Sequence, residues 1–188
     1  MLSQIGQLLI ETLVGFFVYV LLARFYMQAF RVPFRNPLGQ FVMALSDWMV
    51  RPARRVIPGL GGLDFATLLL AWLTEALMLL AMRWLRGFPF AGAVAAGTLL
   101  TLAALELVRA SLYLLVGVVI VQVIISWVNP YAPLGPVFDA LTRPLYNIFR
   151  RFVPPIGNID LSPLFVVLVA QVLLIAIGWL AQAILRPV

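Results

Sequence analysis

Four long apolar stretches alternate with polar stretches along the chain. The apolar stretches cover residues 5–30, 65–83, 104–128 and 163–184. Because the hydrocarbon core of a bilayer is roughly 30 Å thick, a helix needs about 20 mainly apolar residues to cross it. Each stretch meets or nearly meets this length. The pattern therefore predicts an all-α membrane protein with four transmembrane helices.

Shorter amphipathic segments lie between the first and second and between the third and fourth apolar stretches. Apolar residues recur there three and four positions apart, which is typical of one helical face. The first segment carries Leu38, Phe41, Val42, Leu45 and Met49, and the second carries Val137, Leu141, Leu145, Ile148 and Phe152. Trp48 suits the headgroup zone. We expect the first of these helices to lie flat on the membrane surface; the alternative is that it packs on the other helices as a core element.

The two amphipathic segments belong to an internal repeat. Residues 37–68 align without a gap with residues 133–164 at a shift of 96 positions, and 11 of these 32 positions are identical. Self-similarity at a fixed offset indicates one structural unit used twice. We expect one repeat over residues 1–90, an apolar linker over 91–103 and a second repeat over 104–188. Each repeat is a helix, an amphipathic hinge and a helix, and the two are expected to pack with pseudo-two-fold symmetry.

The number of crossings depends on residues 91–103, which are either a linker, interfacial or re-entrant piece or a fifth crossing. Charge placement favours four crossings. Four crossings put both hinges on one side with Arg31, Arg35, Arg51, Arg54, Arg55, Arg143, Arg150 and Arg151, against Arg83, Arg86 and Arg186 on the other. Under the positive-inside rule the hinges then face the cytoplasm. The first helix is expected to remain in the mature protein, because no basic region precedes it and Glu11 interrupts it.

The composition narrows the chemistry. Hydrophobic residues make up 64% of the chain, all 13 cationic residues are arginine, and Cys and His are missing. Without His the chain lacks the commonest metal ligand and the usual acid–base group at neutral pH. We therefore expect no enzymatic activity, no cofactor and no metal site. Most of the arginines lie on the hinge side and the aromatic residues lie in spans and interfaces, so no nucleic-acid partner is expected.

One motif occurs at the end of each hinge. An Arg-Arg pair precedes Pro-x-x-Gly-x-x-Asp at the head of an apolar helix, at Arg54-Arg55 to Asp64 and at Arg150-Arg151 to Asp160. With the duplication and the chain length, this motif resembles the YggT family of small bacterial membrane proteins, also called YlmG, which has chloroplast relatives. The resemblance covers essentially the whole chain. The second copy continues into the family's Ser162-Pro163 element, whereas the first does not.

The resemblance implies a multipass inner-membrane or thylakoid protein without catalytic activity. Bacterial members are linked to osmotic or potassium tolerance, and chloroplast relatives resemble assembly factors. We therefore expect a non-enzymatic scaffold of the inner membrane that presents a basic cytoplasmic platform. The expected partners are anionic lipid headgroups, a membrane protein and, as an open alternative, further copies of the chain. A small oligomeric ion channel or transporter is the alternative function.

Three sets of polar residues are candidate functional groups. Arg54, Arg55, Arg150 and Arg151 either bind anionic headgroups or an acidic partner, or only fix the topology. Asp64 and Asp160 are expected to cap the following helices and to pair with a hinge arginine, roles that are compatible.

Glu75 lies in the middle of the second apolar stretch, where a carboxylate is costly unless it is paired or neutralised. It is either a proton or cation site or a hydrogen-bonded contact between helices. Glu106 and Arg109 are expected to pair at the outer interface. Arg24 is expected to extend to the cytoplasmic surface.

Overall fold

Six helices make up the computed structural model, which describes residues 2–59, 61–87, 92–153 and 160–185. They are α1 (Leu2–Ala29), α2 (Pro37–Val56), α3 (Phe65–Leu85), α4 (Gly92–Val128), α5 (Gly135–Arg150) and α6 (Ser162–Leu185). No strand occurs in these ranges. The helices α1, α3, α4 and α6 are long and apolar enough to cross a bilayer. The predicted all-α membrane fold with four spans is confirmed.

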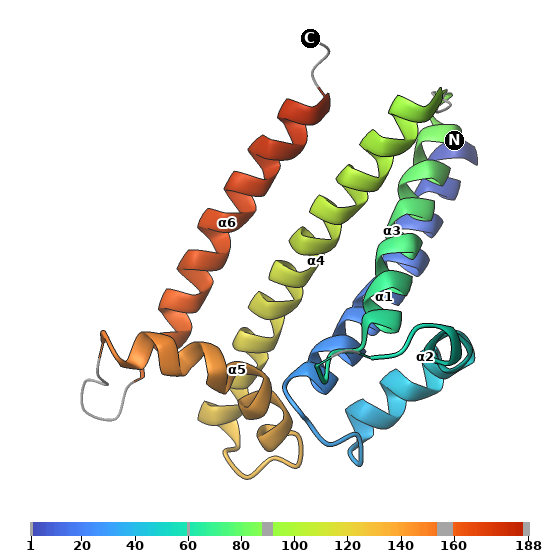
Figure 1. Cartoon of the computed structure of the whole chain (residues 1–188). Helices are drawn as coiled ribbons and strands as arrows, with labels where there is room; N and C mark the ends of the chain where they lie inside the picture. The colour runs from blue at the N-terminus through green and yellow to red at the C-terminus, as the bar shows by residue number, and fades with distance from the viewer. Residues whose placement is uncertain (1, 60, 88–91, 154–159, 186–188) are drawn as a thin grey trace.

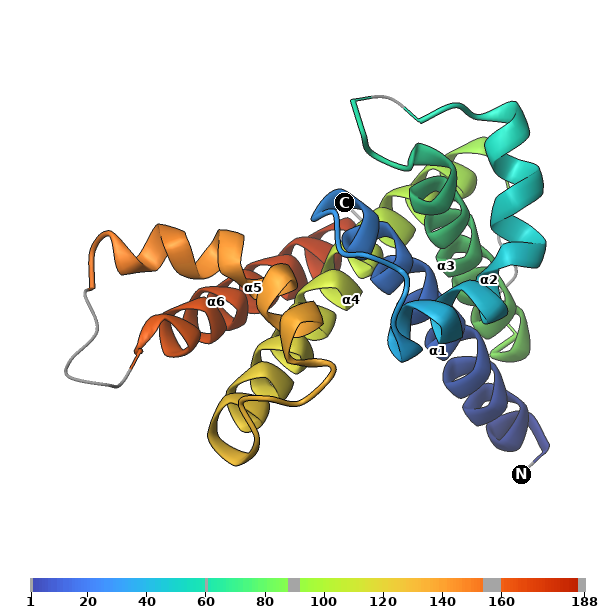
Figure 2. The same cartoon turned by 90° about the horizontal axis from the view of Figure 1, so that it is seen from below.

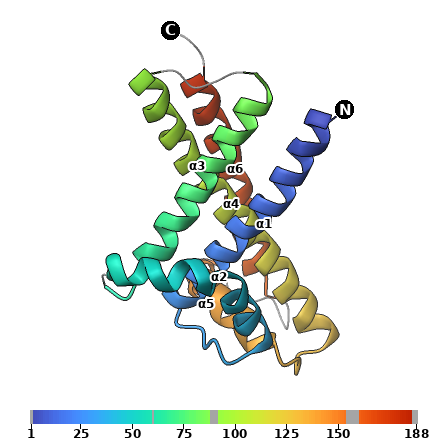
Figure 3. The ribbon, with the colours of Figure 1, turned by 90° about the vertical axis from the view of Figure 1, so that its right-hand side faces the viewer.

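Both short helices lie at one end of the long helices. Figure 1 shows α2 and α5 together at this end, which we call the hinge end, while the start of α1 and the end of α6 lie at the other. The side view in Figure 3 shows the same arrangement. The arginine-bearing segments of the two halves therefore face the same side of the layer formed by the long helices.

The central element is α4, which packs against α1, α3, α5 and α6. Seen from the hinge end, it lies between the group α1–α3 and the pair α5–α6 (Figure 2). Among the described residues, α6 packs extensively only on α4 and α5, whereas α3 packs on both α1 and α4. The contact of α3 with α4 therefore has no extensive equivalent between α6 and α1. Among the described residues, the two repeats therefore do not make the same contacts with each other that a pseudo-two-fold axis would require.

The structure differs from the predicted linker over residues 91–103. Residues 92–103 form the first turns of α4, and residue 91 lies outside the described residues. This stretch is rich in Ala and Leu and contains no Pro, so nothing in it opposes a helix. The apolar part of α4, Ala96–Val128, has 33 residues. At 1.5 Å per residue it is about 50 Å long and exceeds the hydrocarbon core, so it tilts or extends beyond it.

Each short helix packs one face on the long helices. In α2, Val42, Ser46 and Val50 are buried, and α2 packs on α1 and α3. The ring of Trp48 stacks on Phe17 at a centroid distance of 5.9 Å, but the residue remains 70% exposed. The buried face agrees with the core-packing alternative, and the position of the exposed Trp48 in a headgroup zone stays a prediction.

Gly39 and its repeat equivalent Gly135 give a matched test of the packing at the start of α2. A Cβ added to Gly39 would lie 2.7 Å from the backbone of Phe34, whereas one added to Gly135 would lie 3.7 Å from the nearest atom, the oxygen of Pro130. We expect Gly39→Ala to destabilise the fold by about 1–3 kcal/mol, because backbone atoms cannot rotate away. Gly135→Ala should be neutral or slightly stabilising. Thermal unfolding in detergent measures both, and equal losses would contradict this difference.

Candidate functional site

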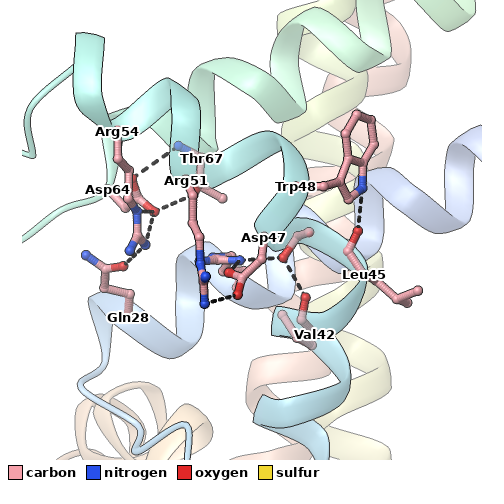
Figure 4. A network of polar contacts seen from close by, with 11 residues as sticks. Gln28, Val42, Leu45, Asp47, Trp48, Arg51, Arg54, Asp64 and Thr67 are labelled. Atoms are coloured by element: carbon pink, nitrogen blue, oxygen red, sulfur yellow. Dashed lines mark hydrogen bonds and ion pairs between the residues drawn. The ribbon is translucent and has the colours of Figure 1, made fainter.

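The first hinge is held by an ion pair between the end of α2 and the start of α3, in which the carboxylate is buried and the arginine is partly exposed. Arg54 donates from Nε (3.0 Å) and Nη2 (2.5 Å) to Oδ2 of Asp64. The Asp64 side chain is only 2% exposed. Its Oδ1 accepts the backbone N–H of Thr67 at 3.2 Å, and its Oδ2 accepts the Thr67 hydroxyl. Figure 4 shows these contacts. The predicted cap and the predicted pairing with a hinge arginine are both confirmed at Asp64.

The second hinge uses the same atoms. Arg150 donates from Nε (3.0 Å) and Nη2 (2.6 Å) to Oδ2 of Asp160. Oδ1 of Asp160 accepts the backbone N–H of Ser162, the first residue of α6, at 2.9 Å. The guanidinium of Arg150 also lies 5.8 Å from the ring centre of Tyr146. The predicted pairing is confirmed here too, and the Asp160 carboxylate satisfies one free N–H at the start of α6.

Both hinge carboxylates are held in the ionised form. Burial alone raises the pKa of Asp64, but hydrogen bonds from Arg54 and Thr67 outweigh it and hold the pKa below its ordinary value of 3.8. At Asp160, hydrogen bonds from Ser162 and Arg150 lower the pKa against burial in the same way. Because the folded pKa is depressed, each pair contributes stability above the unfolded value, and the contribution is lost as the pH falls through the folded value.

In each Arg-Arg motif the first arginine forms an ion pair and the second does not. Arg54 and Arg150 are committed to the carboxylates, whereas Arg55 and Arg151 are exposed. Within the described residues, Arg55 and Arg151 have no hydrogen-bond or ion-pair partner. The same holds for the exposed Arg31, which follows α1 at the hinge end. Of the four predicted arginines, two pair with the hinge carboxylates and two have no partner in the described part of the chain.

Arg24 departs from its prediction. Its side chain is 5% exposed rather than extended to the surface. From α1 its Nη1 donates to Ser46 Oγ at 2.7 Å and lies 2.8 Å from Oδ1 of Asp47. Arg51 contacts the other oxygen of Asp47 at 2.7 Å. A buried cation on α1 thus fixes α2 in place, because among the described residues its charge is compensated by Asp47 of α2.

The two hinges differ in what ties them to the preceding long helix. At the first hinge, Arg54 Nη2 also donates to Oε1 of Gln28 on α1 at 2.5 Å. The residue 96 positions later is Ile124, which has no polar side-chain atom. At the second hinge, the Tyr146 hydroxyl instead bonds Oε1 of Gln122 on α4 at 3.2 Å. Neither contact was predicted from the sequence, although the residues at the repeat offset, Gln28 and Ile124, differ in polarity.

Glu75 faces a cavity inside the membrane-spanning region. The cavity has a volume of about 240 Å³ and lies between α1, α3 and α4. Glu75 is 4% exposed and accepts no hydrogen bond from the described residues. The other titratable or charged groups that line the cavity are Glu11, Tyr19, Glu106, Arg109 and Tyr113. No group of three residues suited to a metal ion occurs within the described ranges.

Glu106 and Arg109 do not lie at the outer interface as predicted. They line the cavity with Glu75, which is the middle residue of α3. Arg109 Nη1 is 3.4 Å from Glu106 Oε1, so the predicted pairing is confirmed. The difference arises because α4 begins about three turns earlier than the sequence suggested, so residues 106–109 lie well inside α4 and beside the middle of α3 rather than at the start of a span.

The difference in exposure between the hinge carboxylates gives a prediction. Asp64→Asn keeps an oxygen that can cap α3 but removes the charge that compensates Arg54, so we expect a loss of about 1–3 kcal/mol in unfolding free energy. Asp160 is 29% exposed, and Asp160→Asn should cost less than about 1 kcal/mol. Thermal unfolding in detergent at neutral pH measures both. A larger loss at Asp160 would show that burial does not set the strength of these pairs.

Comparison with known proteins gives the family. The CCB3/YggT family model matches residues 3–85 and 101–181. An uncharacterised protein of the proC 3′ region of Vibrio alginolyticus is 35% identical over 158 residues, 83% of this chain and 84% of the relative. The uncharacterised protein YggT of Escherichia coli K12 is 31% identical over 93% of this chain and 90% of its own.

A chloroplast protein, YlmG homolog protein 2 of Arabidopsis thaliana, is 41% identical over 54 residues, 28% of this chain and 21% of its own. No solved structure matches the chain. The two matches of the family model cover the two halves of the chain and include both hinge ion pairs. The first match ends at the last residue of α3, and the second begins inside α4. The chain therefore belongs to the CCB3/YggT family.

Proposed function

We propose that this protein is a non-enzymatic scaffold or assembly factor of the bacterial inner membrane. Its hinge end faces the cytoplasm and binds an acidic surface of a membrane-protein partner or anionic lipid headgroups. The observation that carries the proposal is the division of each arginine pair. Arg54 and Arg150 pair with the hinge carboxylates, whereas Arg55 and Arg151 are exposed at the same end without partners in the described part of the chain.

The arrangement of the hinge end supports this role. Figure 2 shows α2 and α5 on either side of α4, so basic residues from both halves are distributed over one face of the protein. An exposed basic residue near an anionic leaflet contributes about 1 kcal/mol to binding. Several such residues on a rigid surface bind an acidic partner in one orientation. The lack of Cys and His in the chain also favours binding over catalysis.

Charge reversal separates binding from folding. In Arg55→Glu/Arg151→Glu we expect at least about tenfold weaker binding of anionic vesicles to the protein held in zwitterionic nanodiscs, since each reversal removes an attraction and adds a repulsion. Unfolding temperature should stay at the wild-type value. Crosslinkers placed at the neighbouring exposed positions Val56 and Phe152 should recover a protein partner when residues 55 and 151 are arginine and lose it when both are glutamate.

Arg86→Glu changes the charge at the opposite end and is the matched control, with hinge-end binding expected at the wild-type level. Vesicle binding and partner recovery that both remain unchanged in the double variant, at equal membrane levels, would reject the platform.

The cavity around Glu75 favours a second candidate, a small oligomeric ion channel or transporter. A buried carboxyl group without a hydrogen bond, in a cavity that also contains Glu106 and Arg109, has the chemistry to take up and release a proton or a monovalent cation. Intramembrane ionisable residues commonly mark ion pathways. Four helices leave little room for a pathway within one subunit, so this candidate requires several copies.

Flux measurements test this candidate directly. If the protein conducts, proteoliposomes should show proton or potassium flux, and Glu75→Gln should lower it at least about tenfold because the amide cannot bind and release a proton. The equivalent position in α6 is Gln171, so an amide is compatible with this helix register. Asp139→Asn, at a partly exposed position of α5 that does not line the cavity, is the control. Lack of wild-type flux would reject transport, and unchanged flux in Glu75→Gln would exclude Glu75 from the pathway.

A further inference from the structure

A large groove opens at the second hinge between α4 and α6. Its volume is about 1000 Å³. The end of the groove near the hinge carries Gln122, Tyr146, Arg150 and Asp160, and its walls are apolar side chains of α4 and α6 such as Ile124 and Val167. Figure 1 shows α5 across the hinge end of these two helices. The groove is therefore polar at the membrane surface and apolar toward the membrane interior.

We propose that this groove binds one membrane phospholipid, with the phosphate at Arg150 and the acyl chains along α4 and α6. The inference does not depend on the proposed scaffold role, because it uses neither Arg55 nor Arg151.

Arg150 has the donors that a phosphate requires. A guanidinium has five N–H donors, and the bonds to Asp160 involve only Nε and Nη2. The side chain is 44% exposed and lines the groove. The remaining N–H groups can form the paired bonds to phosphate oxygens that arginine favours. The Asp160 contact holds the guanidinium in place before the ligand arrives.

The other polar groups at this end do not repel a phosphate. Burial raises the pKa of Tyr146 to about 12, so its hydroxyl stays neutral at physiological pH. It is bonded to the amide of Gln122 at 3.2 Å. Among the described residues that line the groove, Asp160 is the only anion, and Arg150 and the backbone N–H of Ser162 already compensate its charge.

The position of the groove identifies the occupant as a lipid. In the described ranges α6 packs extensively only on α4 and α5, so the groove is open sideways to the bilayer. Its apolar walls favour hydrocarbon over water. Its volume lies at the upper end of the range for small-molecule sites. A molecule with an anionic head and long apolar chains matches both ends of this surface.

The first hinge shows which residues keep the groove open. There Gln28 accepts a hydrogen bond from Arg54, so α1 is tied to the ion pair. The equivalent residue of α4 is Ile124, which leaves Arg150 without this contact. Two positions later, Phe30, the residue that follows α1, corresponds to Ser126, which lines the groove. In the second half a less polar residue, Ile124, and a smaller residue, Ser126, therefore stand where the first half has Gln28 and Phe30, and both line the groove beside Arg150.

Exchange of these residues between repeats tests the proposal. The protein is reconstituted in vesicles of phosphatidylethanolamine and phosphatidylglycerol, extracted in mild detergent and examined by native mass spectrometry. We expect the wild type to retain a single phospholipid per chain. Ile124→Gln should occupy the donors of Arg150, and Ser126→Phe should fill the groove. Each variant should lower the retained phospholipid at least about tenfold. For Ile124→Gln this is the magnitude of one lost hydrogen bond to a charged group, and for Ser126→Phe the loss comes from the volume that the ring takes up.

Ile124→Leu keeps an apolar side chain of the same size and should retain the lipid as the wild type does. A wild type that emerges without phospholipid, or retention unchanged in both exchange variants, would overturn the proposal. Equal retention of diacylglycerol, which has no phosphate, would also overturn it. Anionic vesicle binding through Arg55 and Arg151 should be the same in all of these variants, so failure of this proposal is distinguishable from failure of the scaffold role.

Discussion

One carboxylate in each hinge determines how the chain returns into the membrane. A helix that starts at the membrane surface has free backbone N–H groups, and the short helix before it ends in a positive charge. Asp64 and Asp160 satisfy both, because one oxygen accepts a backbone N–H and the other accepts a guanidinium. The short helix and the following long helix are thereby fixed to each other, and the rest of the hinge surface is built on this junction.

Much of the hinge could be predicted because the residues that determine it lie close together in the sequence and occur in both halves. The Arg-to-Asp spacing is the same in both halves, and both residues lie at helix ends, so caps and ion pairs follow from the motif. The beginning of α4 was not predictable in this way, since a run of Ala, Leu and Gly has no boundary signal that separates a linker from a helix. The depth of Glu106 depended on that boundary.

The contacts of Arg24 were unpredictable for a different reason: α1 is apolar on nearly all sides, so periodicity does not show which face meets α2. The cavity around Glu75 and the groove beside Arg150 depend on how three helices meet. Sequence offset still helps once the packing is known, because the pairs Gln28/Ile124 and Phe30/Ser126 show where the two halves differ. Both hinges contain the same Arg–Asp ion pair, but only the pair of the first hinge is also bonded to the preceding long helix, through Gln28 of α1. The pair of the second hinge borders a groove instead.

The length and position of α4 have a mechanical consequence. Its apolar part is about 50 Å long for a core of roughly 30 Å, and a helix with such a mismatch changes its tilt when bilayer thickness changes. Because α4 contacts α1 and α3 of the first half and α5 and α6 of the second, a change in its tilt is passed on to both halves. Membrane thinning or stretching would therefore turn both arginine-bearing surfaces together and could not reorient one without the other.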